Sequence, residues 1–378
     1  MNRLEKEALE AQQLHPAALQ SSESRGREFA EIPDAWRTRF ERDRDRIIHS
    51  KAFRRMMYKT QVFINHVGDN QRTRMTHSLE VQQVSRSLAS ALNLNEPLCE
   101  ALAISHDLGH APFGHAGERA LNALMQDAGG FSHNKQSLRV VDVLENRSPD
   151  YLGLNLTHEV KEGLKKHQEI EDADSGETLR HPSLEAMLVD HADSTAYHFH
   201  DVDDGLREGI LDPMHMDEHL ELWNRSLAES RKRHPNLKDG QLLWRRTANE
   251  LLGQTIGDLQ IETQRRLDEF KPSDTHAAQT CSKPLIGHSP DFAKQVGALH
   301  KYLYEHLYFR DEVNWHIRRS TDLLEHLFCA LQNDLSKVPK RYFETADSND
   351  RAVCDYVSGM TDRYVEKVAR ELGVLPSY

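Results

Sequence analysis

The chain has 378 residues and a formal charge of −12, from 48 Lys and Arg against 60 Asp and Glu, with 23 His and only four Cys. A hydrophobic fraction of 38% excludes a disordered chain, and no stretch approaches the ~20 apolar residues of a transmembrane helix. The N-terminus lacks the apolar core of a signal peptide and the cysteines form no CxxC pair, so a cytoplasmic location is expected.

The hydrophobic pattern predicts a mainly helical chain. An amphipathic helix is expected where Val81, Val84, Leu88 and Leu92 recur at helical spacing. A loop is expected around residues 65–70. Further helices are predicted at 34–60, 96–108, 115–127, 136–146, 157–166 and 184–200, with a polar loop at 168–183.

The second half of the chain is also predicted to be helical. Residues 213–270 are expected to form two helices, and 271–290 a linker or surface loop. Alternating strand patterns are nearly absent, so the fold class is all-α. We expect an N-terminal helical extension over 1–40, a core over 41–210 and a helical C-terminal region over 211–378 packed on it, as one continuous domain.

Several histidines fall on predicted inward helix faces. His77 precedes Val81 by four residues and shares its stripe, and His106 lies beside Asp107 at the end of a helix that Gly109 stops. The segment HDLGHAPFGH (106–115) holds three His and one Asp in ten positions. A single histidine on an apolar face is usually structural, but this concentration favours a metal site. Imidazole and carboxylate together suit Mg²⁺, Mn²⁺, Fe²⁺, Co²⁺, Ni²⁺ or Zn²⁺.

A second line of polar residues lies on the later long helix. Asp193, Tyr197 and Asp201 are spaced i, i+4, i+8, so they stack along one face over roughly 12 Å. An acid, a phenol and a second acid beside a core face fit the wall of a pocket.

The pattern H…HD…D, formed by His77, His106-Asp107 and Asp193, resembles the HD-domain metal phosphohydrolases. Within that superfamily the chain is most similar to the deoxynucleoside triphosphate triphosphohydrolases, the dGTPase-like proteins. The segments that carry the resemblance are DRDRIIHSKAFRRMMYKTQVF (43–63), RTRMTHSLEV (72–81), HDLGHAPFGHAGERALN (106–122), FSHNKQS (131–137) and SLEAMLVDHADSTAYHFHDVDDGL (183–206).

The resemblance implies an HD-domain helical fold and a divalent metal held by four ligands. These are His77, His106, Asp107 and Asp193. One departure lies beside Asp193, where Ser194 and Thr195 stand in place of the family's usual acid and apolar residue. This departure brings into question how the residues next to Asp193 adjust the properties of the metal, although the metal-binding Asp is retained.

The resemblance also implies roles around the substrate. His115 and Glu118 match a catalytic His–acid pair, and their i, i+3 spacing lets the carboxylate orient the ring. The remaining matches are His110 and His133 near the triphosphate, Arg74 on the phosphates, Tyr197 and Asp201 on the deoxyribose, and Gln61 near the sugar or base.

The expected reaction is hydrolysis of a dNTP, either dGTP or several dNTPs, to deoxynucleoside and inorganic triphosphate. Water attacks the α-phosphorus and His115 protonates the departing 5′-oxygen. The resemblance further suggests a homo-oligomer such as a hexamer, with dNTPs as effectors as well as substrates, and no membrane partner.

Two alternatives stay open at this point. One is another HD phosphohydrolase, such as a 5′-nucleotidase or an alarmone hydrolase. The other is a regulatory protein that senses dNTPs or binds single-stranded DNA through basic stretches at 37–46, 231–233 and 337–341. Acidic residues interrupt most of these stretches, which favours solvated helix faces over a nucleic-acid groove.

Overall fold

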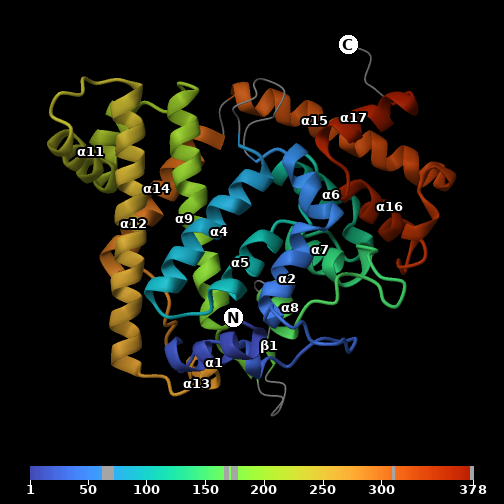
Figure 1. Ribbon diagram of the computed structural model, residues 1–378. Helices are drawn as coiled ribbons and strands as arrows, with labels where there is room; N and C mark the ends of the chain where they lie inside the picture. The colour runs from blue at the N-terminus through green and yellow to red at the C-terminus, as the bar shows by residue number, and fades with distance from the viewer. Residues whose placement is uncertain (62–71, 166–169, 172–177, 309–310, 375–378) are drawn as a thin grey trace.

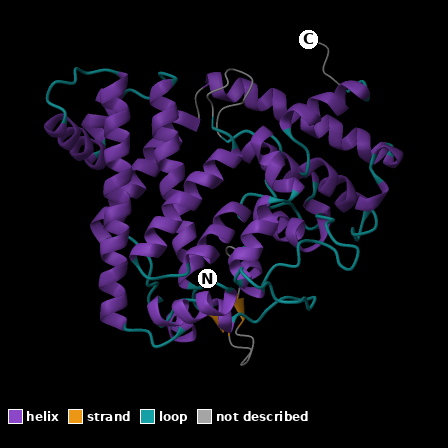
Figure 2. Ribbon diagram, viewed as in Figure 1, coloured by secondary structure: helices purple, strands orange, loops and turns teal. Residues whose placement is uncertain are grey.

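The computed structural model describes residues 1–61, 72–165, 170–171, 178–308 and 311–374, with the backbone alone at 170–171 and 311–318. The all-α prediction is confirmed. The described strands are the short antiparallel pair β1 (Ile170–Glu171) and β2 (Thr178–Leu179), which occupies a small area in Figure 2. The loop predicted at 65–70, which includes His66, lies outside the described residues.

Seventeen α-helices form the described part of the chain. They are α1 (Arg3–Gln13), α2 (Arg39–Ile48), α3 (Lys51–Arg55), α4 (Arg74–Ala91), α5 (Glu96–Ser105), α6 (Gly114–Leu124), α7 (His133–Arg139), α8 (His158–Gly163), α9 (Leu184–Arg207), α10 (Pro213–His219), α11 (Glu221–Arg233), α12 (Gln241–Phe270), α13 (Thr275–Thr280), α14 (Pro290–Leu303), α15 (Asp311–Asn333), α16 (Asn349–Ser358) and α17 (Asp362–Glu371).

Three predicted segments were wrong in detail. The helix expected over 34–60 is divided, because the Ser50 side chain accepts a hydrogen bond from the backbone of Phe53 and starts α3 as a new helix. The region 213–270 holds three helices rather than two, with a break at Gly240 before α12. The expected linker at 271–290 contains α13, which Asp274 caps.

The helices pack around three apolar clusters. The largest is built from α2 to α5, α8 and α9, and it includes Val81, Leu88 and Leu102. A second cluster joins α6 to α15, α16 and α17, and a third joins the end of α9 to α10, α11, α12 and α14. Figure 1 shows α9 and α12 side by side at one flank and α15 to α17 at the other. The boundaries proposed at residues 40 and 210 stay a prediction.

The turn that follows α5 is closely packed, which explains its glycines. A Cβ on Gly109 would lie 2.1 Å from the backbone nitrogen of Ser137, and a Cβ on Gly117 would lie 1.9 Å from the carbonyl oxygen of Pro112. No side chain fits at either position. Two of the three glycines in the segment HDLGHAPFGHAGE are therefore required by close backbone contacts around the turn between α5 and α6.

The C-terminal helices hold this turn in place. Asp362, the first residue of α17, is buried and accepts hydrogen bonds from the Thr60 backbone (2.8 Å), the Thr60 hydroxyl (2.6 Å) and the Phe113 backbone (3.0 Å). Phe113 has a φ of 61°, a left-handed conformation that a phenylalanine adopts only when its surroundings enforce it. The hydrogen bond from the Phe113 backbone to the Asp362 carboxylate helps to hold that conformation.

Replacing Asp362 with Ala should destabilise the fold, because three buried donors lose their acceptor. We expect a loss of about 3 kcal/mol in the free energy of unfolding, measured by urea denaturation. Asp291→Ala, at a side chain that is 90% exposed, is the matched control and should stay within ~0.5 kcal/mol of the wild type. Equal stability of the two variants would contradict the role given to Asp362.

Candidate functional site

The site is centred on the buried carboxylate of Asp107. Its Oδ2 pairs with Nη1 of Arg74 at 2.9 Å, and its Oδ1 lies 3.4 Å from Nε2 of His106 and 4.0 Å from Nε2 of His110. All four residues are at most 4% exposed. Burial alone would raise the pKa of Asp107, but His106 and Arg74 outweigh it and hold that pKa well below its ordinary value. Asp107 is therefore an anion inside the protein.

Two further side chains approach the same point from α4 and α9. Nε2 of His77 lies 3.0 Å from Oδ1 of Asp193, and Nε2 of His106 lies 3.5 Å from the same oxygen. The other nitrogen of His106, Nδ1, lies 2.6 Å from the carbonyl oxygen of Ala103. Donation to that carbonyl fixes the tautomer in which Nε2 carries a lone pair toward the carboxylates.

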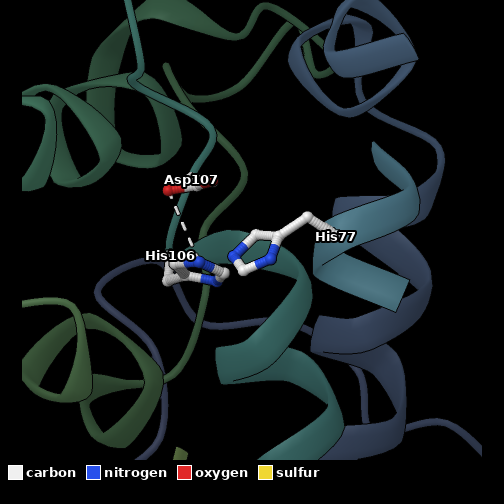
Figure 3. A group of neighbouring side chains, drawn as sticks. All are labelled: His77, His106 and Asp107. Atoms are coloured by element: carbon white, nitrogen blue, oxygen red, sulfur yellow. Dashed lines mark ion pairs between the residues drawn. The ribbon is translucent and has the colours of Figure 1, made fainter. Parts of the chain in front are cut away.

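This arrangement suits a divalent metal. Ligand atoms of His77, His106 and Asp107 all lie within 4.8 Å of one another, and Figure 3 shows the two imidazoles and the carboxylate converging. Asp193 adds a second carboxylate at the same histidines. Two imidazoles and two carboxylates form a donor set that borderline and hard divalent ions accept. The sequence analysis predicted these four residues as metal ligands. The fold brings them together from α4, α9 and the end of α5.

A second group of polar side chains lies next to Asp107. The rings of His110 and His133 stack with centroids 4.3 Å apart, and the His115 ring meets His110 edge-on at 5.2 Å. Glu118 accepts from Nδ1 of His133 at 2.8 Å and lies 3.5 Å from Nδ1 of His115. Glu118 therefore contacts two histidines, of which the sequence spacing indicated only His115.

The charges in this histidine group are set by the surroundings. Burial alone would raise the pKa of Glu118, but hydrogen bonds with His115 and His133 outweigh it and hold that pKa well below its ordinary value. Burial and then the neighbouring Arg74 hold the pKa of His110 well below its ordinary value. The group combines a neutral buried imidazole, an ionised carboxylate and the 54% exposed side chain of His115. Of the three histidines in this group, His115 is the most exposed to solvent.

The predicted sugar-binding residues lie further along α9. Asp201 is fully buried, and the hydroxyl of Tyr308 donates to its Oδ2, while Tyr197 stacks on Tyr308 with ring centroids 6.3 Å apart. Burial, followed by the charge of Asp204, raises the pKa of Asp201 well above its ordinary value. Gln61 is 8% exposed and adjoins Thr60, whose carbonyl oxygen accepts from Nε of Arg74 at 3.1 Å.

Three residues near the site were missed from the sequence. Tyr308 is far from Asp201 in the chain, and no local pattern marks it. Nδ1 of His200 lies 3.2 Å from Nδ1 of His77, and the spacing of His200 from Asp193 along α9 was the signal that could have found it. Lys59 is buried and donates to the carbonyl oxygens of His110 and Ser358.

Two of the basic stretches are largely neutralised. Arginines in the stretch at 37–46 pair with Glu31, Asp34, Asp45 and Glu100, and those at 231–233 pair with Glu229 and Asp239. These pairs favour solvated helix faces over a nucleic-acid groove. Among the described residues, no helix combines the length and apolar character needed to cross a membrane.

Comparison with known proteins matches both halves of the chain. The HD domain matches residues 74–198, and the phosphohydrolase-associated domain matches residues 286–371. A deoxyguanosinetriphosphate triphosphohydrolase-like protein of Thiobacillus denitrificans is 44% identical over 366 residues, covering 94% of this chain and 96% of that protein. The chain belongs to the deoxyguanosinetriphosphate triphosphohydrolase-like family. Family members of the same name from Nitrosomonas europaea and Geobacter metallireducens are 42% and 41% identical, over 93% and 92% of this chain and 95% and 91% of those proteins.

The family match agrees with the geometry. The HD region runs from Arg74 to His198 and includes His77, His106, Asp107 and Asp193. The phosphohydrolase-associated region includes Asp362, which holds the turn at Phe113. The chain is thus a phosphohydrolase-family protein in which the second matched region supports the first.

Removing two of the proposed ligands should abolish metal binding. We expect the double variant His106→Ala, Asp107→Ala to lose bound Mn²⁺ in equilibrium dialysis, because one imidazole and one carboxylate are gone. His326→Ala, at an exposed histidine, controls for the loss of a histidine and should keep wild-type stoichiometry. A double variant that retains its Mn²⁺ would show that the ion binds elsewhere.

Proposed function

We propose that this protein hydrolyses deoxynucleoside triphosphates to deoxynucleoside and inorganic triphosphate, with a divalent metal held by His77, His106, Asp107 and Asp193. The observation that carries the proposal is the position of this donor set directly beside Arg74 and the histidine group of His110, His115 and His133. A metal-type donor set adjoining cationic and imidazole donors suits a polyanionic substrate despite the net charge of −12.

Two buried donors lack protein partners and support a bound ligand. Among the described residues, Nη2 of Arg74 and Nδ1 of His110 have no hydrogen-bond partner. Unsatisfied buried polar groups are costly and mark places where a ligand completes the hydrogen bonding. Arg74 would bind the phosphate oxygens through Nη2 while Nη1 keeps its contact with Asp107.

A divalent metal at this site, such as Mg²⁺ or Mn²⁺, would offset charge on the phosphoryl oxygens and lower the pKa of water. The histidine group supplies the proton transfer. In the proposed step, water adds to the α-phosphorus, the bond from that phosphorus to the 5′-oxygen breaks, and protonated His115 gives its proton to the departing oxygen. Glu118 orients His115 and stabilises its imidazolium form, and its contacts with His133 hold the carboxylate in place.

The far end of α9 would bind the sugar. Oδ1 of Asp201 is buried and has no partner among the described residues, whereas Oδ2 accepts from Tyr308. A free acceptor beside the Tyr197 ring suits a 3′-hydroxyl, and the ring would leave no room at the 2′ position. This arrangement favours deoxyribonucleotides over ribonucleotides.

The products test the proposed function most simply. A panel of the four dNTPs with Mg²⁺, Mn²⁺ or Co²⁺ should release deoxynucleoside and inorganic triphosphate, read by chromatography and ³¹P NMR. Release of orthophosphate or pyrophosphate would favour another HD phosphohydrolase. Nucleotide binding without any hydrolysis under these conditions would favour the sensing protein.

His115→Ala should separate proton transfer from metal binding. We expect turnover to fall by about 10²–10⁴-fold, the range for loss of a general acid, while Mn²⁺ stoichiometry in dialysis stays unchanged. His326→Ala should retain wild-type turnover. If His115→Ala loses the ion instead, then His115 is a ligand rather than the proton donor.

A further inference from the structure

His200 lies between a histidine of the candidate metal site and a carboxylate on the same neighbouring helix. It belongs to α9, which packs against α4 (Figure 1). The residue is 1% exposed, and its ring meets the ring of His77 edge-on, with centroids 5.3 Å apart. His77 and Glu80 are three residues apart on α4, so they lie on one face of that helix and both contact the imidazole of His200.

Each nitrogen of the His200 ring faces one of these two residues. Nδ1 lies 3.2 Å from Nδ1 of His77, and Nε2 is in close contact with the carboxylate of Glu80. Nε2 is buried, and the described residues offer it no other hydrogen-bond partner. On the far side of His77, its Nε2 lies 3.0 Å from Oδ1 of Asp193. The side chains therefore form a row that leads from the Glu80 carboxylate to the metal site.

The position of the metal site determines where the hydrogens of this row must lie. Two imidazole nitrogens in contact share one hydrogen, so one of them donates and the other accepts. A metal at Nε2 of His77 takes the lone pair of that nitrogen, so Nδ1 of His77 carries the hydrogen and donates it to Nδ1 of His200. His200 then carries its own hydrogen on Nε2, where the Glu80 carboxylate is the acceptor.

Glu80 is available to accept this hydrogen. Arg72 lies 3.6 Å from Glu80, but it also pairs with Asp203 at 2.9 Å and with Asp204. Glu80 is therefore not the main counter-charge of Arg72. Its side chain is 38% exposed, so water solvates one part of the carboxylate while another part contacts His200.

A second buried histidine on α9 provides the comparison. His198 is 8% exposed, and its Nε2 lies 3.1 Å from Nδ1 of His300 on α14. Its printed contacts include no predicted metal ligand. Burial on α9 is thus common to both histidines, whereas contact with His77 distinguishes His200.

We propose that His200 is a positioning residue for the metal site, which accepts a hydrogen bond from His77, donates one to Glu80 and so fixes the tautomer in which Nε2 of His77 binds the ion. In this role His200 needs no contact with the metal or the substrate. The Ala103 carbonyl oxygen acts on His106 in the same way. The inference rests on the metal site of the proposed function and adds to it a residue outside the predicted ligand set.

Equilibrium dialysis with Mn²⁺ tests this role without turnover. His200→Leu and His200→Asn have side chains of similar size, but only Asn can accept from Nδ1 of His77. We expect His200→Leu to bind Mn²⁺ about 10–100-fold more weakly than the wild type, the range for loss of such a partner, and His200→Asn to stay close to the wild type. The matched control, His198→Leu, places the same apolar side chain at the other buried histidine of α9 and should bind as the wild type does.

Equal Mn²⁺ affinities of the Leu and Asn variants, whether strong or weak, would overturn the proposal, because hydrogen-bond acceptance at this position would then have no effect. That result, with Mn²⁺ bound to the wild type, leaves the proposed function intact. A wild type that binds no Mn²⁺ would instead overturn the metal site of the proposed function and this inference with it.

Nitrogen-15 NMR of the imidazoles in the wild type loaded with diamagnetic Mg²⁺ supplies a second readout that depends on no variant being stable. We expect the His200 ring to carry its hydrogen on Nε2, with Nδ1 as a hydrogen-bonded acceptor, and the His77 ring to carry its hydrogen on Nδ1. A hydrogen on Nδ1 of His200 would overturn the proposal, because His200 would then donate to His77 rather than accept from it.

Discussion

The ion pair between Arg74 and Asp107 is the contact around which the rest of the site is arranged. A carboxylate this deeply buried is costly unless positive charge and hydrogen bonds surround it. Arg74 supplies one charge, and the imidazoles of His106 and His110 face the other oxygen. These groups still leave two carboxylates, Asp107 and Asp193, near the same imidazole nitrogen. A bound cation would complete that balance, so the electrostatics and the donor chemistry point to the same kind of ligand.

The second constraint is the connection between the catalytic turn and the C-terminal helices. Asp362 accepts from Thr60 and Phe113, and Lys59 donates to His110 and Ser358. The turn is therefore held by Lys59, which precedes the matched HD region, and by Asp362 of the phosphohydrolase-associated region. This arrangement lets the second region act as a support for the first.

The sequence predicted the parts of the fold and site that depend on local pattern. The stripe of Val81, Val84 and Leu88 identified α4 and the inward face of His77, and the spacing from Asp193 to Asp201 identified one face of α9. Contacts between distant segments leave no such pattern, so the partners of Asp201 and Phe113, which are Tyr308 and Asp362, were not found. The pairing of Glu118 with His133 was missed for the same reason, since its i, i+3 neighbour His115 was the visible candidate.

The central claim is that a divalent ion sits between the two imidazoles and the two carboxylates. Anomalous diffraction from crystals soaked in Mn²⁺ tests it most directly. The account predicts one strong peak within coordinating distance of His77, His106, Asp107 and Asp193. A strong peak among His110, His115 and Glu118 instead, with none at the first group, would contradict it.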